Sequence, residues 1–180
     1  QFASGKEILN CFSYTGGFSV YAVKAGASKV INVDSSAESL VLAEKNFFLN
    51  GIDSSKFENT HDDVFKYLRK LRDTNRQFDV IILDPPKFAE SVSQIDKAAR
   101  GYKDINLLAL KLLKKNGLLF TFSCSGHIVP DLFNKIIADA AADAGGEVHI
   151  LKYLTQSPDH TMLTSFPEGL YLKGLICKVN

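Results

Sequence analysis

The chain of 180 residues has no tryptophan, one methionine and only three cysteines. Because the cysteines are odd in number and far apart, they argue against a disulfide framework and for a reducing compartment, so we expect a cytoplasmic protein. No segment approaches the ~18 uncharged apolar residues of a membrane span, and no signal peptide precedes the first strand signal. No cysteines and histidines are spaced as a metal cluster, so we expect neither a membrane nor a metal partner.

An excess of one charge is also missing, since 21 lysines and arginines balance 20 aspartates and glutamates for a net charge of +1. If the chain binds nucleic acid, most of the affinity should therefore come from a local patch or from another domain. The apolar fraction of 46% is that of a soluble globular protein, and residues 1–180 are enough for a single domain with a full core. Because the chain does not start with methionine, we expect it to be a fragment of a longer protein.

Apolar runs typical of strands alternate with amphipathic stretches typical of helices. The expected strands are Glu7–Cys11, Lys29–Val33, Phe57–Thr60, Phe78–Leu83, Gly117–Phe122, Glu147–Leu154 and Gly169–Val179. The expected helices are Gly17–Ala25, Ser36–Asn50, Val64–Arg72, Ile105–Lys115 and Pro130–Ala144. This order predicts an α/β fold with a doubly wound, mostly parallel seven-stranded sheet and one antiparallel strand near the C-terminus.

One polar stretch, Ala89–Lys103, is longer than the usual ~2–6 residues of a strand-to-helix connection. We expect it to be a substrate-binding loop in which Arg100 and Lys103 contact phosphates and Tyr102 offers a stacking surface. A charged loop without a ligand is the alternative.

The turn after the first strand indicates a cofactor site without phosphates. Its paired glycines, Gly16 and Gly17, lack the G-x-G-x-x-G spacing, and Phe12 and Tyr14 stand where small residues would admit a pyrophosphate. Carboxylates at the ends of the second and third strands would suit a ribose and an adenine amine, although helix capping also explains them. Together these signals predict S-adenosylmethionine, bound by Phe12, Ser13, Tyr14, Thr15, Gly16, Gly17, Asp34, Ser35, Asn50, Asp62, Asp63, Val64, Asp84 and Pro85.

Two buried strands end in reactive side chains, namely Asp84 and Cys124. Since ligands sit beyond the carboxyl ends of parallel strands, we expect this acid and this thiol to share one crevice. The combination indicates covalent catalysis. Cys11 and Cys177 lie within apolar strands and are interpreted as small buried side chains.

Five segments together resemble the RlmI-like bacterial cytosine-5 methyltransferases of large-subunit ribosomal RNA. They are Asn10–Phe18, Asp84–Phe88, Arg100–Asn106, Thr121–Gly126 and Pro167–Gly174. The resemblance spans the whole chain and implies a class I, Rossmann-like methyltransferase fold, S-adenosylmethionine as cofactor and RNA as partner. It also implies an N-terminal PUA RNA-binding domain that this chain lacks, and we leave a homodimer open.

The chemistry of cytosine explains these residue types. A thiolate that adds to carbon 6 makes carbon 5 nucleophilic, so Cys124 is the candidate nucleophile. Asp84 can stabilise charge at ring nitrogen 3, and Pro85-Pro86 offers a rigid wall for an extruded base. The expected substrate-binding residues are Pro86, Lys87, Arg100, Tyr102, Lys103, Ser125 and His160.

Many cytosine-5 RNA methyltransferases have a second cysteine directly after the Pro-Pro pair, but here that position is Lys87. The base that removes the carbon 5 proton therefore stays open between Lys87, a water molecule and the phosphate backbone. A uracil-5 methyltransferase needs the same thiolate, whereas an amino-group methyltransferase using Asp84–Phe88 would not need Cys124. A cofactor-binding protein without catalysis is a further alternative, and the missing glycine spacing disfavours a nicotinamide oxidoreductase.

Overall fold

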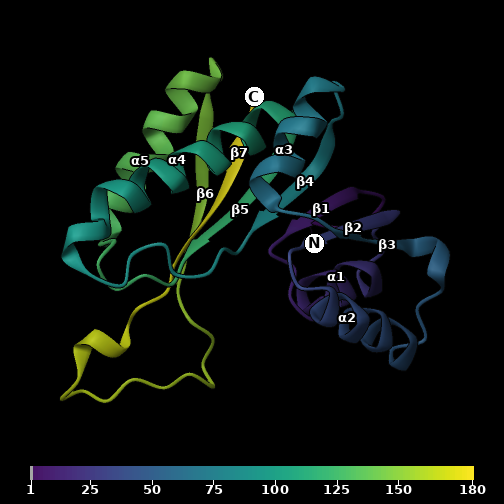
Figure 1. Ribbon diagram of the computed structural model, residues 1–180, viewed down its shortest axis with the longest axis horizontal. Coiled ribbons are helices and arrows are strands. Elements are labelled where there is room, and N and C mark those ends of the chain that lie inside the picture. Colours follow the sequence, from purple (N-terminus) through teal and green to yellow (C-terminus); the bar gives the residue numbers. More distant parts are fainter. Residues whose placement is uncertain (1) are drawn as a thin grey trace.

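Seven strands form one sheet in the order β3-β2-β1-β4-β5-β7-β6 in a computed structural model that describes residues 2–180 (Figure 1). Strands β1 to β5 run parallel, and β7 runs antiparallel to both of its neighbours, β5 and β6. The predicted doubly wound sheet with one antiparallel strand is confirmed. The strands are β1 Glu7–Cys11, β2 Lys29–Asp34, β3 Phe57–His61, β4 Phe78–Leu83, β5 Leu113–Ser123, β6 Val148–Leu154 and β7 Lys173–Val179.

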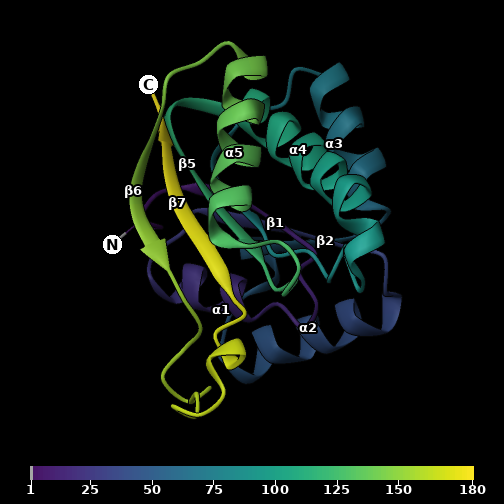
Figure 2. The ribbon, with the colours of Figure 1, turned by 90° about the vertical axis from the view of Figure 1, so that its left-hand side faces the viewer.

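Helices cover both faces of the sheet, with α1 and α2 on one face and α3, α4 and α5 on the other (Figure 2). They span α1 Gly17–Lys24, α2 Ala37–Leu49, α3 Val64–Asp73, α4 Ile95–Leu112 and α5 Pro130–Ala144. The alternation within β1 explains this layering, because Ile8 packs with Ala22 of α1 while Leu9 packs in the α3–α5 core. A strand buried on both faces is mostly apolar, which is why Val80–Leu83 of β4 and Leu118–Phe120 of β5 are continuous hydrophobic runs and the buried parts of β1 and β2 are interrupted only by one asparagine each.

Helix α4 corrects one prediction, because the long loop expected over Ala89–Lys103 is wrong. The chain forms a short 3-10 turn at Val92–Gln94 and enters α4 at Ile95, ten residues before the predicted start. Residues Ala98, Tyr102, Ile105 and Ala109 are buried at spacings of three and four, so they form one face of this helix. The charged residues between them lie on the solvent side and made the segment resemble a loop.

A row of asparagine side chains crosses three strands beneath α1 and α2. Asn10, Asn32 and Asn59 are register partners on β1, β2 and β3. The amide of Asn32 donates to Asn59 at 2.8 Å, and its carbonyl oxygen accepts from Ser19 of α1 at 2.5 Å and from Asn10 at 3.4 Å. Asn59 donates in turn to the backbone carbonyl of Leu40 on α2. This polar row, called the asparagine ladder below, joins the sheet to both helices.

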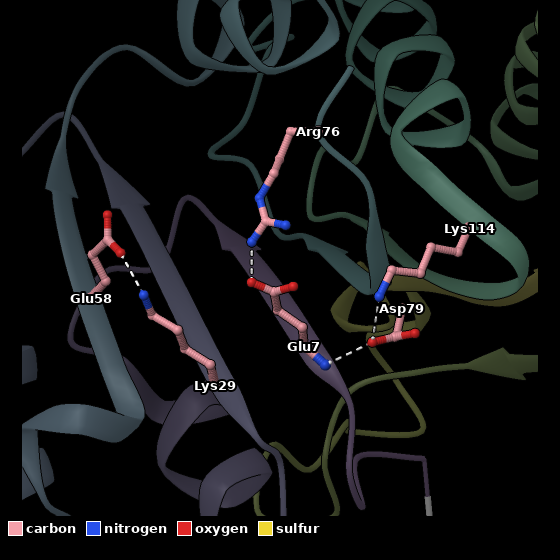
Figure 3. A network of polar contacts seen from close by, with 6 residues as sticks. All are labelled: Glu7, Lys29, Glu58, Arg76, Asp79 and Lys114. Carbon is pink, nitrogen blue, oxygen red and sulfur yellow. Dashed lines mark hydrogen bonds and ion pairs between the residues drawn. The ribbon is translucent and has the colours of Figure 1, made fainter. Parts of the chain in front are cut away.

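Ion pairs link neighbouring strands at the end of the sheet where the parallel strands begin (Figure 3). Lys29 pairs with Glu58 at 2.8 Å, Arg76 pairs with Glu7, and Lys114 pairs with Asp79 at 3.1 Å. Each pair is partly exposed, so we expect at most about 1 kcal/mol from each. The ion pairs therefore help to align the starts of the strands. The other end of the sheet, where the parallel strands stop, is left for ligands. Within residues 2–180, no helix combines the length and the apolar character needed to cross a membrane.

Candidate active site

A cleft of about 820 Å³ opens at the carboxyl ends of the parallel strands. The ends of β1, β2, β4 and β5 all reach it, together with the segment before β7. This is the place where ligands bind in open parallel sheets. Its walls are made by Phe12, Tyr14, Phe18, Asp34, Ser35, Asp84, Pro85, Pro86, Phe122, Cys124, Tyr171 and Leu172.

Asp34 holds the loop that follows β1, which we call the first loop (residues 12–16). Its Oδ2 accepts a hydrogen bond from the backbone N–H of Tyr14 at 2.8 Å, and its Oδ1 accepts one from Ser36 at 2.9 Å. Helix capping is therefore not its role, because Ser36 is the residue that caps α2. Each oxygen keeps a free lone pair on the cleft, which leaves the carboxylate able to accept ligand hydroxyls.

The first loop has an unusual backbone. Phe12 and Tyr14 have φ of 57° and 47°, in the left-handed region that few residues other than glycine adopt, and Gly16 follows at 76°. Such strain clusters at ligand sites. Ser13 lies buried between these residues, and its Oγ finds no hydrogen-bond partner within residues 2–180. A loop held in this shape, with an orphaned hydroxyl, is suited to closing around a polar ligand.

The other residues predicted to bind the cofactor differ in where the structure places them. Asp62 lies beside Asp34, since its backbone N–H donates to the Asp34 carbonyl at 3.1 Å. Asp63 caps α3 and Val64 is buried in the core, so helix capping accounts for this pair of positions. Asn50 lies away from the cleft, where it ends α2 and bonds to Lys24, so the structure does not bring it to the predicted site.

Cys124 and Asp84 lie in the same cleft, as their positions after adjacent strands predicted. The thiol is half-buried, and its nearest polar partner is the Pro85 carbonyl oxygen at 3.8 Å, directly after Asp84. Cys11 and Cys177 are fully buried inside the sheet, which agrees with the prediction that they only pack. Cys124 is thus the accessible thiol among the three.

The residues on either side of Cys124 explain why it faces the cleft. Ser123 and Ser125 are fully buried. Ser123 donates to the phenol oxygen of Tyr102 at 3.1 Å, and Ser125 donates to the backbone carbonyl of Ala89 at 2.7 Å. With both serines turned inward, the side chain between them turns outward. The prediction that Ser125 contacts substrate is therefore wrong, because its hydroxyl holds the segment after β4 in place.

Burial and charge act on both reactive groups. Burial raises the pKa of the Asp84 carboxyl above its usual value, which extends its protonated form toward higher pH. Burial also raises the pKa of the Cys124 thiol, and the nearby Asp84 raises it further, while the charges of Lys87 and Lys173 lower it. The pair therefore combines a carboxyl group whose protonated form extends to higher pH with a thiol whose ionisation depends on burial, on Asp84 and on two neighbouring lysines.

Three residues predicted to bind substrate lie on α4. Tyr102 is fully buried and packs against Phe88 with ring centroids 4.6 Å apart and planes tilted by 39°, so the prediction of an exposed stacking surface is wrong. Lys103 pairs with Asp143 of α5 at 2.7 Å, which ties it to the helix layer, whereas Arg100 is exposed. His160 is exposed in the segment between β6 and β7 and does not line the cleft. Pro86 and Lys87 are exposed directly after Asp84, as expected.

Several residues that line the cleft have no role predicted from the sequence. Phe18 and Phe122 stack with ring centroids 5.6 Å apart, and Tyr171 and Leu172 line the same cleft, where Leu172 packs against the cluster that contains Phe122. The signal for the second pair was the antiparallel last strand. Such a strand begins where parallel strands end, so the residues just before β7 must reach the ends of β4 and β5.

The cleft suits a cationic cofactor better than a phosphate-bearing one. Among residues 2–180, its walls hold two carboxylates, Asp34 and Asp84, and several aromatic rings but no lysine or arginine. Two neighbouring cations, Lys87 and Lys173, act at the thiol end of the cleft. A sulfonium is attracted by carboxylates and by ring faces, whereas a pyrophosphate would be repelled. Beside Gly17, at the start of α1, an added Cβ would meet no atom within 4 Å, so space is available next to the first loop. Within residues 2–180 no cluster of three or more potential metal ligands occurs.

Curated relatives match almost the whole chain. It is 54% identical over 179 residues to a protein of Enterobacter sp. (strain 638) and 55% identical over 179 residues to one of Klebsiella pneumoniae (strain 342). Both are named ribosomal RNA large subunit methyltransferase I. Each match covers 99% of this chain and 45% of the relative, so the chain spans about half the length of the curated relatives it matches.

Solved structures share the fold. SMU.776, complexed with SAH, has a TM-score of 0.84 and 29% identity over 98% of this chain and 46% of its own. The SAM-dependent methyltransferase of Agrobacterium tumefaciens has a TM-score of 0.72 and 21% identity over 97% of this chain and 56% of its own, which shows the fold alone. Residues 1–171 also match a family model described as S-adenosylmethionine-dependent methyltransferase. The chain therefore belongs to the S-adenosylmethionine-dependent methyltransferases.

Proposed function

We propose that this protein methylates carbon 5 of a cytosine in large-subunit ribosomal RNA through a transient bond between Cys124 and the base. The observation that carries the proposal is the shared cleft of an accessible thiol and a partly buried carboxyl, Cys124 and Asp84. The names of the relatives support the RNA substrate. Because the chain spans about half of those relatives, the activity of the whole protein is part of this proposal.

Each reactive residue has one task in the proposed reaction. The Cys124 thiolate adds to carbon 6 of the cytosine, which makes carbon 5 nucleophilic. The Asp84 carboxyl, whose pKa burial raises, donates its proton toward ring nitrogen 3 as charge develops there. After methylation, a base (Lys87, a water molecule or the phosphate backbone) takes the carbon 5 proton, the bond between carbon 6 and sulfur breaks to release the Cys124 thiolate, and the proton on ring nitrogen 3 returns to Asp84, which restores the aromatic ring.

The cofactor binds at the other end of the cleft in this proposal. S-adenosylmethionine supplies the activated methyl group when it is bound. The first loop and the Asp34 carboxylate hold it, and the aromatic rings of Phe12 and Tyr14 shield that end of the cleft from water.

We expect the Asp34→Ala variant to bind S-adenosylmethionine more weakly by about 1–3 kcal/mol, because it strands the hydrogen-bond donors that the carboxylate satisfies. The variant also frees the Tyr14 N–H that fixes the first loop. Isothermal titration calorimetry measures the dissociation constant. Glu38→Ala, which removes an exposed acid in the first turn of α2, is the matched control and should leave the constant unchanged. Equal affinity of the Asp34 variant and the wild type would contradict the assignment.

Incubation with labelled S-adenosylmethionine and large-subunit ribosomal RNA tests the reaction. After digestion to nucleosides, mass spectrometry should identify 5-methylcytidine as the labelled product. Label in 5-methyluridine would instead support a uracil-5 methyltransferase, and label on an exocyclic amine would support an amino-group methyltransferase. Cofactor binding without label in any RNA would support the reading without catalysis.

Three further features belong to the same proposal. The domain works with an N-terminal PUA RNA-binding domain, which is in accord with the relatives' greater length and with the near-zero net charge. The protein acts in the cytoplasm without a metal. A homodimer stays a prediction.

A further inference from the structure

Lys173 is the first residue of β7, and the sheet places it beside the proposed nucleophile. In the antiparallel pairing of β5 and β7, Lys173 is the register partner of Ser123, the residue before Cys124. Its ammonium then reaches past Cys124, donating to the backbone carbonyl of Ser125 at 2.5 Å. Lys173 therefore spans the segment from the residue before Cys124 to the residue after it.

A second contact fixes the ammonium in this position. Lys173 Nζ also donates to the carbonyl oxygen of Tyr171 at 2.7 Å, on the wall of the cleft. Two of its three N–H donors are thus used on neutral acceptors, and the third is free. The side chain is half-buried, yet within residues 2–180 it pairs with no carboxylate. A half-buried cation without a counter-charge raises the free energy of the folded state, so we expect a functional reason for its position.

Four groups from different elements act on the Cys124 thiol. Asp84 after β4 opposes its ionisation, Lys87 in the same segment and Lys173 on β7 favour it, and the neutral phenol of Tyr102 lies on the helix side. Lys87 is exposed, so water and salt screen its charge. Lys173 is half-buried, and burial lowers the pKa of its ammonium, whereas a thiolate at Cys124 acts in the opposite direction, so the interaction is mutual.

We propose that Lys173 is a positioning residue for catalysis, whose fixed ammonium stabilises the thiolate of Cys124 and so prepares it for attack. The thiol proton leaves to solvent, and the thiolate then supplies the counter-charge that the ammonium lacks. The purpose of this ion pair rests on the proposed function. Its existence does not, since ionisation of Cys124 can be measured without RNA or cofactor.

Alkylation of Cys124 by iodoacetamide measures this ionisation, because the thiolate is the reacting form. Cys11 and Cys177 are fully buried, so mass spectrometry of the peptide containing Cys124 reports the accessible thiol. In Lys173→Gln, which keeps a donor for the two carbonyls but removes the charge, we expect the midpoint of the pH profile to rise by about one unit. Alkylation below the midpoint should then be about tenfold slower, with an unchanged limit at high pH.

Lys178→Gln is the matched control, because Lys178 lies at the far end of β7 opposite Leu118 and should leave the profile unchanged. Lys173→Arg should restore most of the wild-type profile, which a purely structural role of the residue would not predict. If the Gln variant fails to fold, Lys173→Met provides the same loss of charge with a similar length. A wild-type profile in a folded, uncharged variant would overturn the inference. So would a shift that arginine does not reverse.

Discussion

The Cys124→Ala variant is expected to lose methyl transfer by a factor on the order of 10⁴ or more, while its affinity for S-adenosylmethionine stays close to that of the wild type. Removing a nucleophile abolishes the covalent route and leaves only the contribution of binding. The cofactor is expected at the first loop and Asp34, and the loop contacts that hold that end do not involve Cys124. Single-turnover rates of methyl transfer and calorimetric dissociation constants measure the two quantities separately.

Cys177→Ala is the control for this experiment, because it also removes a sulfur but from a fully buried position in β7. Its activity should remain, with a modest loss of stability from the small cavity. If the Cys124 variant kept its rate, the covalent mechanism would be wrong and the amino-group alternative would gain support.

The second large effect is expected from Asp84→Asn, which should slow methyl transfer by about 100-fold or more. The amide has nearly the same shape but cannot give up a proton to the ring nitrogen. The same change removes the negative charge that raises the pKa of the Cys124 thiol. The midpoint of the Cys124 alkylation profile should therefore fall to lower pH. We expect the variant to combine a more reactive thiol with a lower rate of methyl transfer.

This opposite pair of changes is expected of a chemical role of Asp84. Because an opened cleft would also lower the thiol pKa by relieving its burial, the thermal unfolding midpoint of the variant must match that of the wild type. The direction in which proton donation by Asp84 changes with pH follows from the raised pKa of its carboxyl. The carboxyl is protonated below that pKa and loses its proton above it, so proton donation declines as the pH rises through it. Asp143→Asn, an exposed acid on α5, is the control. An unchanged rate in the Asp84 variant would contradict the proposed acid.

The sequence predicted the parts of the site that follow directly from strand ends. Asp34 is the last residue of β2, and Asp84 and Cys124 are the first residues after β4 and β5, and parallel strands bring such positions to one edge. These features depend on local pattern and on a topology with few alternatives.

Other features depended on tertiary packing, which the pattern did not reveal. Tyr102 sits among charged residues in the sequence, yet the apolar spacing of α4 buries it against Phe88. Ser125 follows Cys124 closely, but alternation along the strand end turns it inward to Ala89. Lys173 acquires its place only through antiparallel pairing with a strand about 50 residues earlier, and such pairings are not local signals.

The asparagine ladder has a consequence for how accurately the two ends of the cofactor site meet. Asn10 and Asn32 are fully buried and Asn59 is partly buried, and the hydrogen bonds between their amides form at only one alignment of β1, β2 and β3, because a slip by one residue would send Asn32 to the other face. Phe12 lies two residues beyond Asn10, and Asp34 lies two residues beyond Asn32. When the amides of the ladder are paired, the first loop and the Asp34 carboxylate therefore lie at the same level along the strands. An interior made only of hydrocarbon side chains could hold the strands together as firmly, but it would not fix their register.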